Sequence, residues 1–148
     1  MRFHLVDRIL ECEPGVSVRG RKVCSLAEDF WEGPPGEERM PPPLVLEAFC
    51  QAGTWLVMIT TERRKRAALL SIESVEFLGD VHPGDVLDLE GKVESMGDEV
   101  AVLSGRAVVD GRVVLEVRDV MCALIDADTL ADLDDTGRLQ TMLTRSGD

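Results

Sequence analysis

The chain has 148 residues, of which 45% are hydrophobic and 30% charged, proportions typical of one globular domain with a single core. Its 16 Lys and Arg against 28 Asp and Glu give a formal net charge of −12. Such a surface repels polyanions, which excludes nucleic acid as a partner, and no apolar run reaches the roughly 20 residues of a membrane span. Only two histidines and no tyrosine are present, which limits the acid–base chemistry that the chain can assemble.

The four cysteines are scattered, with no C-x-x-C pair: Cys12, Cys24, Cys50 and Cys122. We expect buried free thiols rather than a metal site or a disulfide framework. The N-terminus lacks a long apolar segment followed by a small-residue cleavage site, so we expect no secretion signal. Both observations favour a reducing, cytoplasmic location.

The first half of the chain predicts two strands, a loop and a helix. The strands cover residues 5–12 and 16–25, with Glu13-Pro14-Gly15 as the turn between them. Residues 28–43 contain five prolines and two glycines and are expected to form a loop. Residues 44–59 are apolar around most of the helical circumference, which predicts a helix buried on every side. The basic run 61–66 is expected at the exposed helix end, where cations are favoured.

Beyond Ala67 the hydrophobic period changes to two, which predicts four strands over 69–77, 86–94, 99–109 and 112–125. Asp110-Gly111, flanked by valine pairs, is typical of a two-residue hairpin, and His82-Pro83-Gly84-Asp85 forms another turn. One helix followed by antiparallel strands predicts an α+β fold with a curved sheet around the helix. We assign residues 1–125 to one domain and 126–148 to an acidic extension containing at most a short surface helix.

A polar stripe interrupts the predicted helix. Glu47, Gln51 and Thr54 follow one another at spacings of four and three, so they share one helical face. A carboxyl group buried there is either paired or kept protonated, and the protonated form is what a general acid requires. A carboxyl group satisfied by backbone atoms in a purely structural role is an equally good interpretation of the same pattern.

Residues 30–51, FWEGPPGEERMPPPLVLEAFCQ, resemble the signature of β-hydroxyacyl-[acyl carrier protein] dehydratases of the FabZ/FabA type. That signature runs roughly F-F-x-G-H-F-P-G-x-P-x-M-P-G-V-L-x-x-E-A-x-A-Q. Leu5-Val6-Asp7-Arg8 and His82-Pro83-Gly84-Asp85 match further family segments in the same order. The resemblance implies a hotdog fold, usually dimeric with substrate tunnels along the interface, and a role in fatty-acid or polyketide biosynthesis.

The resemblance also implies a mechanism. In this family a histidine removes the α-proton of a 3-hydroxyacyl thioester, and a glutamate on the central helix protonates the departing hydroxyl. The glycine N–H of M-P-G holds the thioester oxygen. Glu47 matches the glutamate, and Gln51 matches a supporting glutamine one turn later. The histidine position falls on Gly33, and Pro42, which has no N–H, replaces the glycine.

In such dimers each site takes its histidine and glycine from one chain and its glutamate from the other. This chain therefore resembles a non-autonomous dehydratase subunit that gives Glu47 to a composite site with a His-bearing partner. Two alternatives stay open: a catalytically silent hotdog that binds an acyl chain or acyl carrier protein, and an acyl-thioesterase in which Glu47 activates water. Neither His4 nor His82 is expected to replace the base, because one lies by the first strand and the other in a turn.

Further residues are assigned to binding. Phe30, Trp31, Pro42 and Thr54 are predicted to contact the substrate, and the docking surface for an acidic carrier protein is predicted at Arg63, Arg64, Lys65 and Arg66. A solvated helix end explains the same basic run equally well. We expect no metal and no cofactor beyond the phosphopantetheine that carries the substrate. The expected partners are acyl carrier protein or an acyl thioester, and a second hotdog chain in a homodimer or heterodimer.

Overall fold

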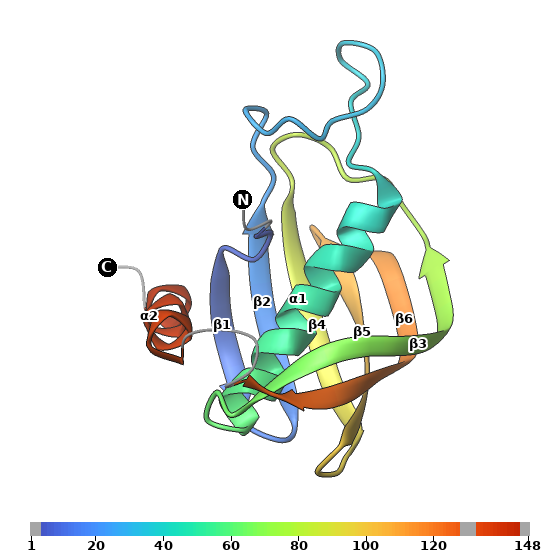
Figure 1. Cartoon of the computed structure of the whole chain (residues 1–148). Coiled ribbons are helices and arrows are strands. Elements are labelled where there is room, and N and C mark those ends of the chain that lie inside the picture. Colours follow the sequence, from blue (N-terminus) through green and yellow to red (C-terminus); the bar gives the residue numbers. More distant parts are fainter. Residues whose placement is uncertain (1–3, 128–132, 146–148) are drawn as a thin grey trace.

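The computed structural model describes residues 4–127 and 133–145 and shows a curved six-stranded sheet around one long helix (Figure 1). Its elements, in chain order, are β1 (Arg8–Glu13), β2 (Ser17–Val23), α1 (Pro42–Thr60), β3 (Lys65–Phe77), β4 (Val86–Met96), β5 (Val100–Val109), β6 (Arg112–Asp126) and α2 (Leu133–Thr144). The predicted α+β hotdog architecture is confirmed. The division of the chain at residue 125 stays a prediction.

The sheet has the strand order β1-β2-β4-β5-β6-β3, and every neighbouring pair is antiparallel. The β5–β6 hairpin turns at Asp110 and Gly111, whose φ angles of 48° and 77° are the left-handed values that a type I′ turn requires. β1 and β3 form the two outer strands, because each has a hydrogen-bonded neighbour on one side only.

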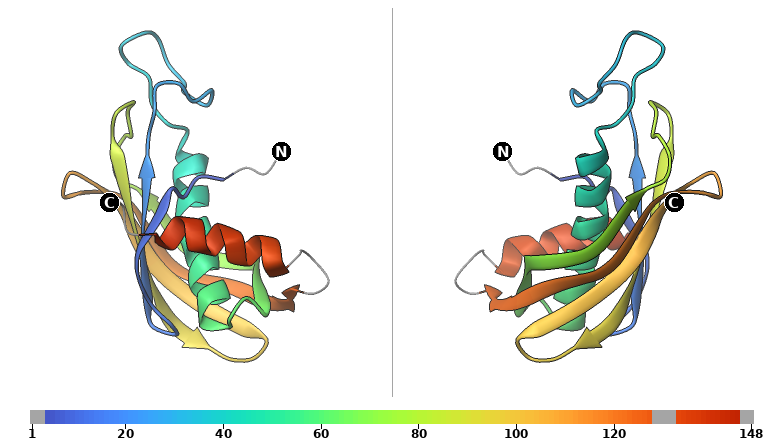
Figure 2. Two further views of the ribbon diagram at one scale, coloured as in Figure 1. Left: turned by 90° about the vertical axis from the view of Figure 1, so that its left-hand side faces the viewer. Right: turned by 90° about the vertical axis from the view of Figure 1, so that its right-hand side faces the viewer.

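The core lies between α1 and the concave face of the sheet, which wraps around the helix in Figure 2. The Phe49 ring of α1 is 2% exposed and lies against Gly91 of β4 and Gly105 of β5, which pair directly across the sheet. A Cβ atom on Gly105 would collide with the Phe49 ring and with the Glu90 carbonyl oxygen. The paired glycines therefore let the sheet approach the helix closely at this point.

The helix ends differ from the predicted ones. α1 begins at Pro42, two residues early, because proline is tolerated in the first helical turn, where its missing N–H has no intrahelical role. After Thr60 the chain reverses through Glu62 and Arg63, whose φ angles of 54° and 67° are left-handed. Lys65 and Arg66 then belong to β3, so their predicted place at the helix end is wrong.

The prediction that α1 is buried on every side is also wrong. The sheet covers one side of the helix, whereas Glu47 on the other side is exposed and Gln51 and Thr54 are half-buried. By length and composition alone α1 could cross a membrane, but half of that stretch is buried inside the molecule. Its apolar character therefore fits the role of a core helix.

The two outer strands are covered unequally. α2 lies beside β1 (Figures 1 and 2), and Arg8 donates from Nη1 to the carbonyl oxygens of Met142 and Arg145 at 3.3 and 2.8 Å. A short helix was predicted in this C-terminal part, of which residues 128–132 and 146–148 lie outside the described residues. β3, in contrast, leaves Leu69 and Leu70 59% and 57% exposed.

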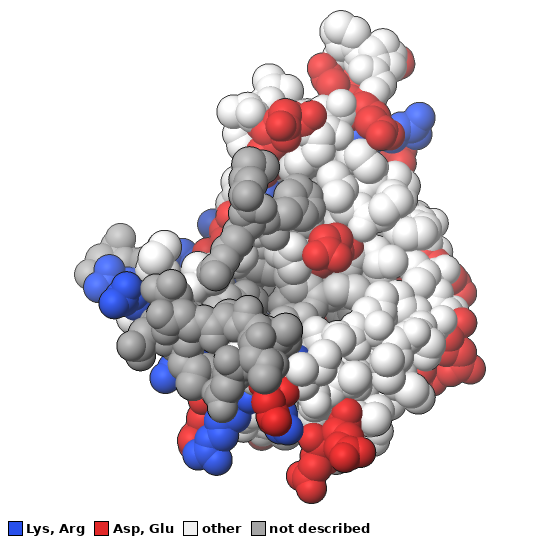
Figure 3. Space-filling model, in the orientation of Figure 1, with Lys and Arg blue, Asp and Glu red and all other residues white. Residues whose placement is uncertain are grey.

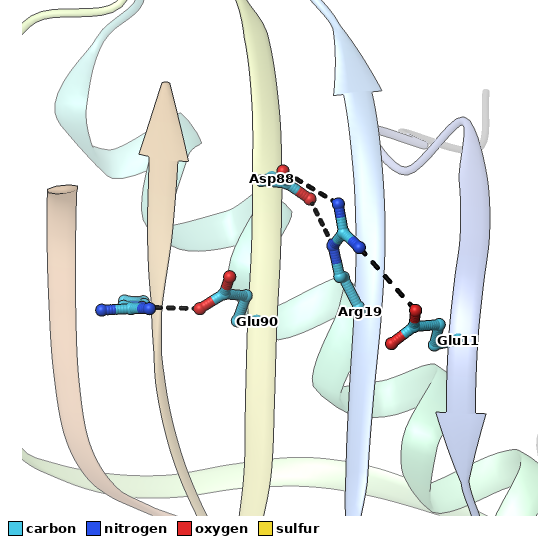
Figure 4. Close-up of polar contacts among 5 residues, drawn as sticks. Glu11, Arg19, Asp88 and Glu90 are labelled. Carbon is cyan, nitrogen blue, oxygen red and sulfur yellow. Dashed lines mark hydrogen bonds and ion pairs between the residues drawn. The ribbon is translucent and has the colours of Figure 1, made fainter. Parts of the chain in front are cut away.

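The convex face of the sheet carries charged pairs (Figure 4). Arg19 on β2 donates to the Asp88 carboxylate at 2.9 and 3.3 Å and lies 3.8 Å from Glu11 on β1. Arg106 on β5 donates to Glu90 at 2.6 Å. Solvent screens exposed pairs of this kind, so they mark a hydrated outer surface rather than a source of fold stability.

We expect Gly105→Ala to lower the free energy of unfolding by about 3 kcal/mol, because the added methyl group overpacks the contact with Phe49 and the Glu90 carbonyl. Gly97→Ala is the matched control, since the nearest atom to its Cβ is the Val100 carbonyl oxygen at 3.7 Å. The control should stay within about 0.5 kcal/mol of wild type. Urea unfolding followed by circular dichroism measures both, and equal stabilities would contradict the packing argument.

Candidate functional site

A groove of about 200 Å³ lies between α1 and strands β3, β5 and β6. Its lining residues come from the helix and from the concave side of the sheet: Glu47, Phe49, Cys50, Gln51, Gly53, Thr54, Ala67, Leu69, Leu103, Val120 and Cys122. The predicted polar stripe of Glu47, Gln51 and Thr54 therefore lies together along one wall. Figure 3 shows that the surface over α1 and β3 is mostly uncharged.

Gln51 links the candidate acid to the N-terminal segment. Its Nε2 donates to Glu47 Oε1 at 3.1 Å, and its Oε1 accepts the Leu5 N–H at 2.7 Å. These contacts use both ends of the amide, so the Gln51 side chain is held in one orientation and in turn restrains the Glu47 carboxyl. Thr54 donates to the Cys50 carbonyl oxygen at 2.9 Å and so satisfies its hydroxyl within the helix.

All four cysteines are free thiols, as predicted, although Cys12 and Cys50 are only half-buried. Cys50 of α1 and Cys122 of β6 both line the groove. Burial raises the pKa of the Cys50 thiol to about 12, with a further contribution from the Glu47 carboxylate, and burial also raises the pKa of Cys122. Both thiols are therefore protonated at neutral pH and serve as lining rather than as nucleophiles.

The loop before α1 has no room for a side chain at Gly33, the position that the resemblance predicts for the family's histidine. Gly33 has a φ angle of 110°, and a Cβ atom there would lie 2.7 Å from the Glu37 carbonyl oxygen. A backbone bridge between Glu32 and Arg39 closes this part of the loop. The loop conformation therefore depends on glycine at this position.

The start of α1 offers few N–H groups to a ligand. Pro42 and Pro43 have none, and the Leu44 N–H donates to the Pro41 carbonyl oxygen at 2.9 Å. Helix N-termini bind anions through free N–H groups, so the first three positions of this helix cannot hold an oxyanion.

The structure does not bring three of the predicted substrate-contacting residues to the groove: Phe30, Trp31 and Pro42 do not line it. Phe30 and Trp31 pack on each other with ring centroids 4.9 Å apart. Lys22, 2% exposed, lies against Phe30, with its Nζ 5.6 Å from the ring centroid. The same Nζ forms a salt bridge with Glu28 at 2.6 Å. Sequence reasoning missed Lys22, although its period-two spacing from the buried Val18 already indicated an inward position.

The four cations of the predicted docking surface, residues 63–66, have different surroundings. Lys65 bonds Asp126 at 2.7 Å, and Arg66 Nη1 lies 2.7 Å from the Met58 sulfur. The Arg63 guanidinium lies over α2, while Arg64 is 77% exposed. Arg64 is therefore the most accessible of the four cations.

We expect Cys50 to react with iodoacetamide at pH 8 about a thousandfold more slowly than an unperturbed thiol, because only the thiolate attacks. Glu47→Gln should accelerate this reaction, since it removes a charge that raises the pKa of Cys50. Site-resolved mass spectrometry measures the rate in both proteins. Identical Cys50 rates would show that Glu47 does not act on this thiol.

Comparisons with known proteins identify the family of this chain. A family model described as a FabA-like domain matches residues 1–118. The 3-hydroxyacyl-[acyl-carrier-protein] dehydratase FabZ of Roseiflexus castenholzii is 39% identical over 116 residues, which cover 77% of this chain and 81% of that protein. The FabZ of Nitratidesulfovibrio vulgaris is 37% identical over 127 residues, which cover 83% of this chain and 81% of the relative.

Solved structures with low sequence identity show the same fold. A Streptococcus mutans protein bound to acetyl CoA superposes with a TM-score of 0.65 at 16% identity, covering 83% of this chain and 92% of that one. A Pyrococcus horikoshii protein gives a TM-score of 0.67 at 16% identity, covering 82% and 85%. From the family match and the identity over most of its length, the chain belongs to the FabA-like family of hotdog proteins that includes the FabZ 3-hydroxyacyl-[acyl-carrier-protein] dehydratases.

Proposed function

We propose that this chain takes part in the dehydration of 3-hydroxyacyl thioesters and gives the acid, Glu47, to a site that it shares with a second hotdog chain. In this reaction a base removes a proton from C2, the C3–oxygen bond breaks, and the acid protonates the departing hydroxyl. The products are water and a 2-enoyl thioester. The observation that supports the proposal most is the Glu47–Gln51 hydrogen bond at the wall of the groove.

The groove of a single chain holds the acid without a base. Among the described residues, its lining contains a carboxyl, an amide, a hydroxyl, two thiols and hydrocarbon groups. The loop has Gly33 at the family's histidine position, and the helix begins with two prolines where an oxyanion would need an N–H. A His-bearing partner chain would complete both missing functions, and in this sense the subunit is not autonomous.

The outer strand β3 is the surface that we propose for this partner. Ala67 and Leu69 of β3 form part of the groove wall, and the strand has β6 as its neighbour on one side only. Exposed outer strands readily accept another strand, because their N–H and C=O groups are unpaired along that side. A chain added there would therefore close the groove beside Glu47.

The substrate in this proposal arrives on the phosphopantetheine of an acyl carrier protein, in fatty-acid or polyketide biosynthesis in the cytoplasm. The basic run 63–66 remains our docking surface for that acidic carrier, with Arg64 as its most accessible cation.

In a complex with a His-bearing hotdog homologue, we expect Glu47→Gln to lower kcat for dehydration of 3-hydroxybutyryl carrier protein by about 10²- to 10⁴-fold, the usual contribution of a general acid. Glu13→Gln, an exposed carboxylate at the end of β1, is the control and should leave kcat unchanged. Product is followed through the absorbance of the enoyl thioester.

Three other results would decide against the proposal. Unchanged kcat in Glu47→Gln would remove Glu47 from the reaction. Acyl binding by the wild-type complex without any turnover would favour the silent binding protein. Thioester hydrolysis by the chain alone, lost in Glu47→Gln, would favour the thioesterase.

We expect Gln51→Leu to lower the free energy of unfolding by about 1–2 kcal/mol, because the buried Leu5 N–H loses its acceptor. It should also lower kcat, since Glu47 loses the amide that restrains it. Gln51→Glu keeps an acceptor for Leu5 but no donor for Glu47, so it should be more stable than Gln51→Leu while kcat stays low. Urea unfolding measures the role of Gln51 as the acceptor for Leu5, and the dehydration assay measures its role as the donor to Glu47. If Gln51→Leu and Gln51→Glu were equally stable, Gln51 would not stabilise the fold through the Leu5 N–H.

A further inference from the structure

The groove beside Glu47 has an open end and a buried end. Glu47 and Leu69 line it and are both exposed, so they mark the open end. Phe49, Leu103 and Val120 line the same groove but are only 2%, 3% and 4% exposed. The groove therefore runs from the molecular surface into the core between α1 and the sheet.

The buried end of the groove is apolar. Thr54, the last residue of the polar stripe, satisfies its hydroxyl on the Cys50 carbonyl oxygen. Gly53 has no side chain, and the sheet contributes the hydrocarbon side chains of Leu103 and Val120. An unpaired charge is costly in such surroundings, whereas a hydrocarbon chain gains free energy by leaving water. The buried end is therefore suited to the acyl part of a ligand.

Leu103 of β5 closes the buried end against the helix. A Cβ atom on Gly53 would lie 3.4 Å from Leu103 Cδ1, so this leucine occupies the space beside the bare helix backbone. Leu103 is opposite Val93 of β4 and Val120 of β6, which fixes its backbone in the middle of the sheet. The leucine cannot withdraw from Gly53 without moving three strands.

The Phe49 ring forms a second fixed wall. It packs so closely on the backbone of Gly105 that a single added Cβ atom there would overlap it. Gly91 on the neighbouring strand lies against the same ring. Close-packed groups of this kind resist displacement. The depth of the groove is therefore set by the fold rather than adjusted by the ligand.

The volume of the groove limits the length of an acyl chain. At roughly 30 Å³ per atom, the share of one water molecule in the liquid, the groove of about 200 Å³ holds about six or seven atoms. With C3 of the substrate beside Glu47, this space takes C2, C3, the 3-hydroxyl oxygen and about three further carbons. An acyl chain of about six carbons fills it.

We propose that this chain selects short acyl groups of about four to six carbons, and that the contact of Leu103 with Gly53 sets this limit. The inference rests on the proposed function, from which it takes an acyl thioester as the ligand, and it adds the chain-length class. Each methylene buried in the groove raises affinity about fourfold. A methylene beyond the sixth carbon meets Leu103 and adds nothing.

The test measures binding rather than turnover, with the purified full chain. The probes are butanoyl, hexanoyl and octanoyl analogues of acyl-pantetheine in which an amide replaces the thioester. They carry no 3-hydroxyl and no thioester, so they are neither dehydrated nor hydrolysed during the measurement. Calorimetric titration should show that affinity rises about tenfold from butanoyl to hexanoyl and does not rise from hexanoyl to octanoyl.

Leu103→Ala removes three carbons from the buried end and lengthens the groove. We expect the octanoyl amide to bind this variant about tenfold more tightly than it binds wild type, while butanoyl affinity changes less than twofold. Leu89→Ala is the matched control, because Leu89 is equally buried in the sheet but does not line the groove. The control should keep the wild-type order of affinities, which separates a change in the groove from a general loss of core packing.

Gly53→Ala shortens the groove from the helix side. Alanine is the better helix former, so this variant should fold even if the leucine variants do not. Its methyl group points at Leu103 and takes the place of the last acyl carbon. We expect hexanoyl affinity to fall about tenfold, while butanoyl affinity changes less than twofold.

The outcomes separate this inference from the proposed function. Octanoyl binding to wild type that is tighter than hexanoyl binding, or equal profiles in wild type and Gly53→Ala, would overturn the inference even if dehydration depends on Glu47. Absence of binding of all three amides would overturn it too. If the chain-length limit is found but Glu47→Gln leaves kcat of the complex unchanged, the proposed reaction fails and the limit on acyl length stands.

Discussion

The contact between Phe49 and the paired glycines Gly91 and Gly105 is the interaction on which the rest of the molecule depends. It lets the sheet bend closely around α1, and thereby decides which side of the helix is covered. The opposite side carries Glu47 and Gln51 into the groove. A helix buried all round would have enclosed the carboxyl, whereas this arrangement leaves it accessible to a substrate.

The segment before α1 is held by side-chain and backbone contacts, although it has almost no regular structure. Lys22 is buried under Phe30 and paired with Glu28, and a buried lysine is tolerated only with a close counter-charge. The turn that carries His82 adds hydrogen bonds from the other side. Because both faces of the loop are fixed, residues at its border keep defined positions relative to α1.

Much of this molecule can be predicted from local sequence patterns. The change from helical to alternating periodicity located α1 and the strands, and the spacing of Glu47, Gln51 and Thr54 placed them on one wall. The exposure of Glu47 could not be predicted in this way, because it depends on how far the sheet curls around the helix. Periodicity describes one element at a time and contains no information about what covers it.

Three further features depend on contacts or conformations that local patterns do not encode. β3 begins at Lys65 because Glu62 and Arg63 adopt left-handed φ angles, which residues of these types rarely do. Phe30 and Trp31 look like tunnel lining by composition but pack on each other instead, with Phe30 next to Lys22. The His82–Glu38 hydrogen bond joins residues 44 positions apart, so its existence follows only from the folded chain.

The unequal cover of the two outer strands has a consequence for the size of any assembly. α2 lies along β1 and is tied to it by Arg8, whereas β3 is open. A sheet that can extend at both ends grows into a fibre, but one that can extend at a single end is completed by one partner. Among the described residues, α2 thus covers the outer strand β1, and β3 is the outer strand that remains open to backbone pairing.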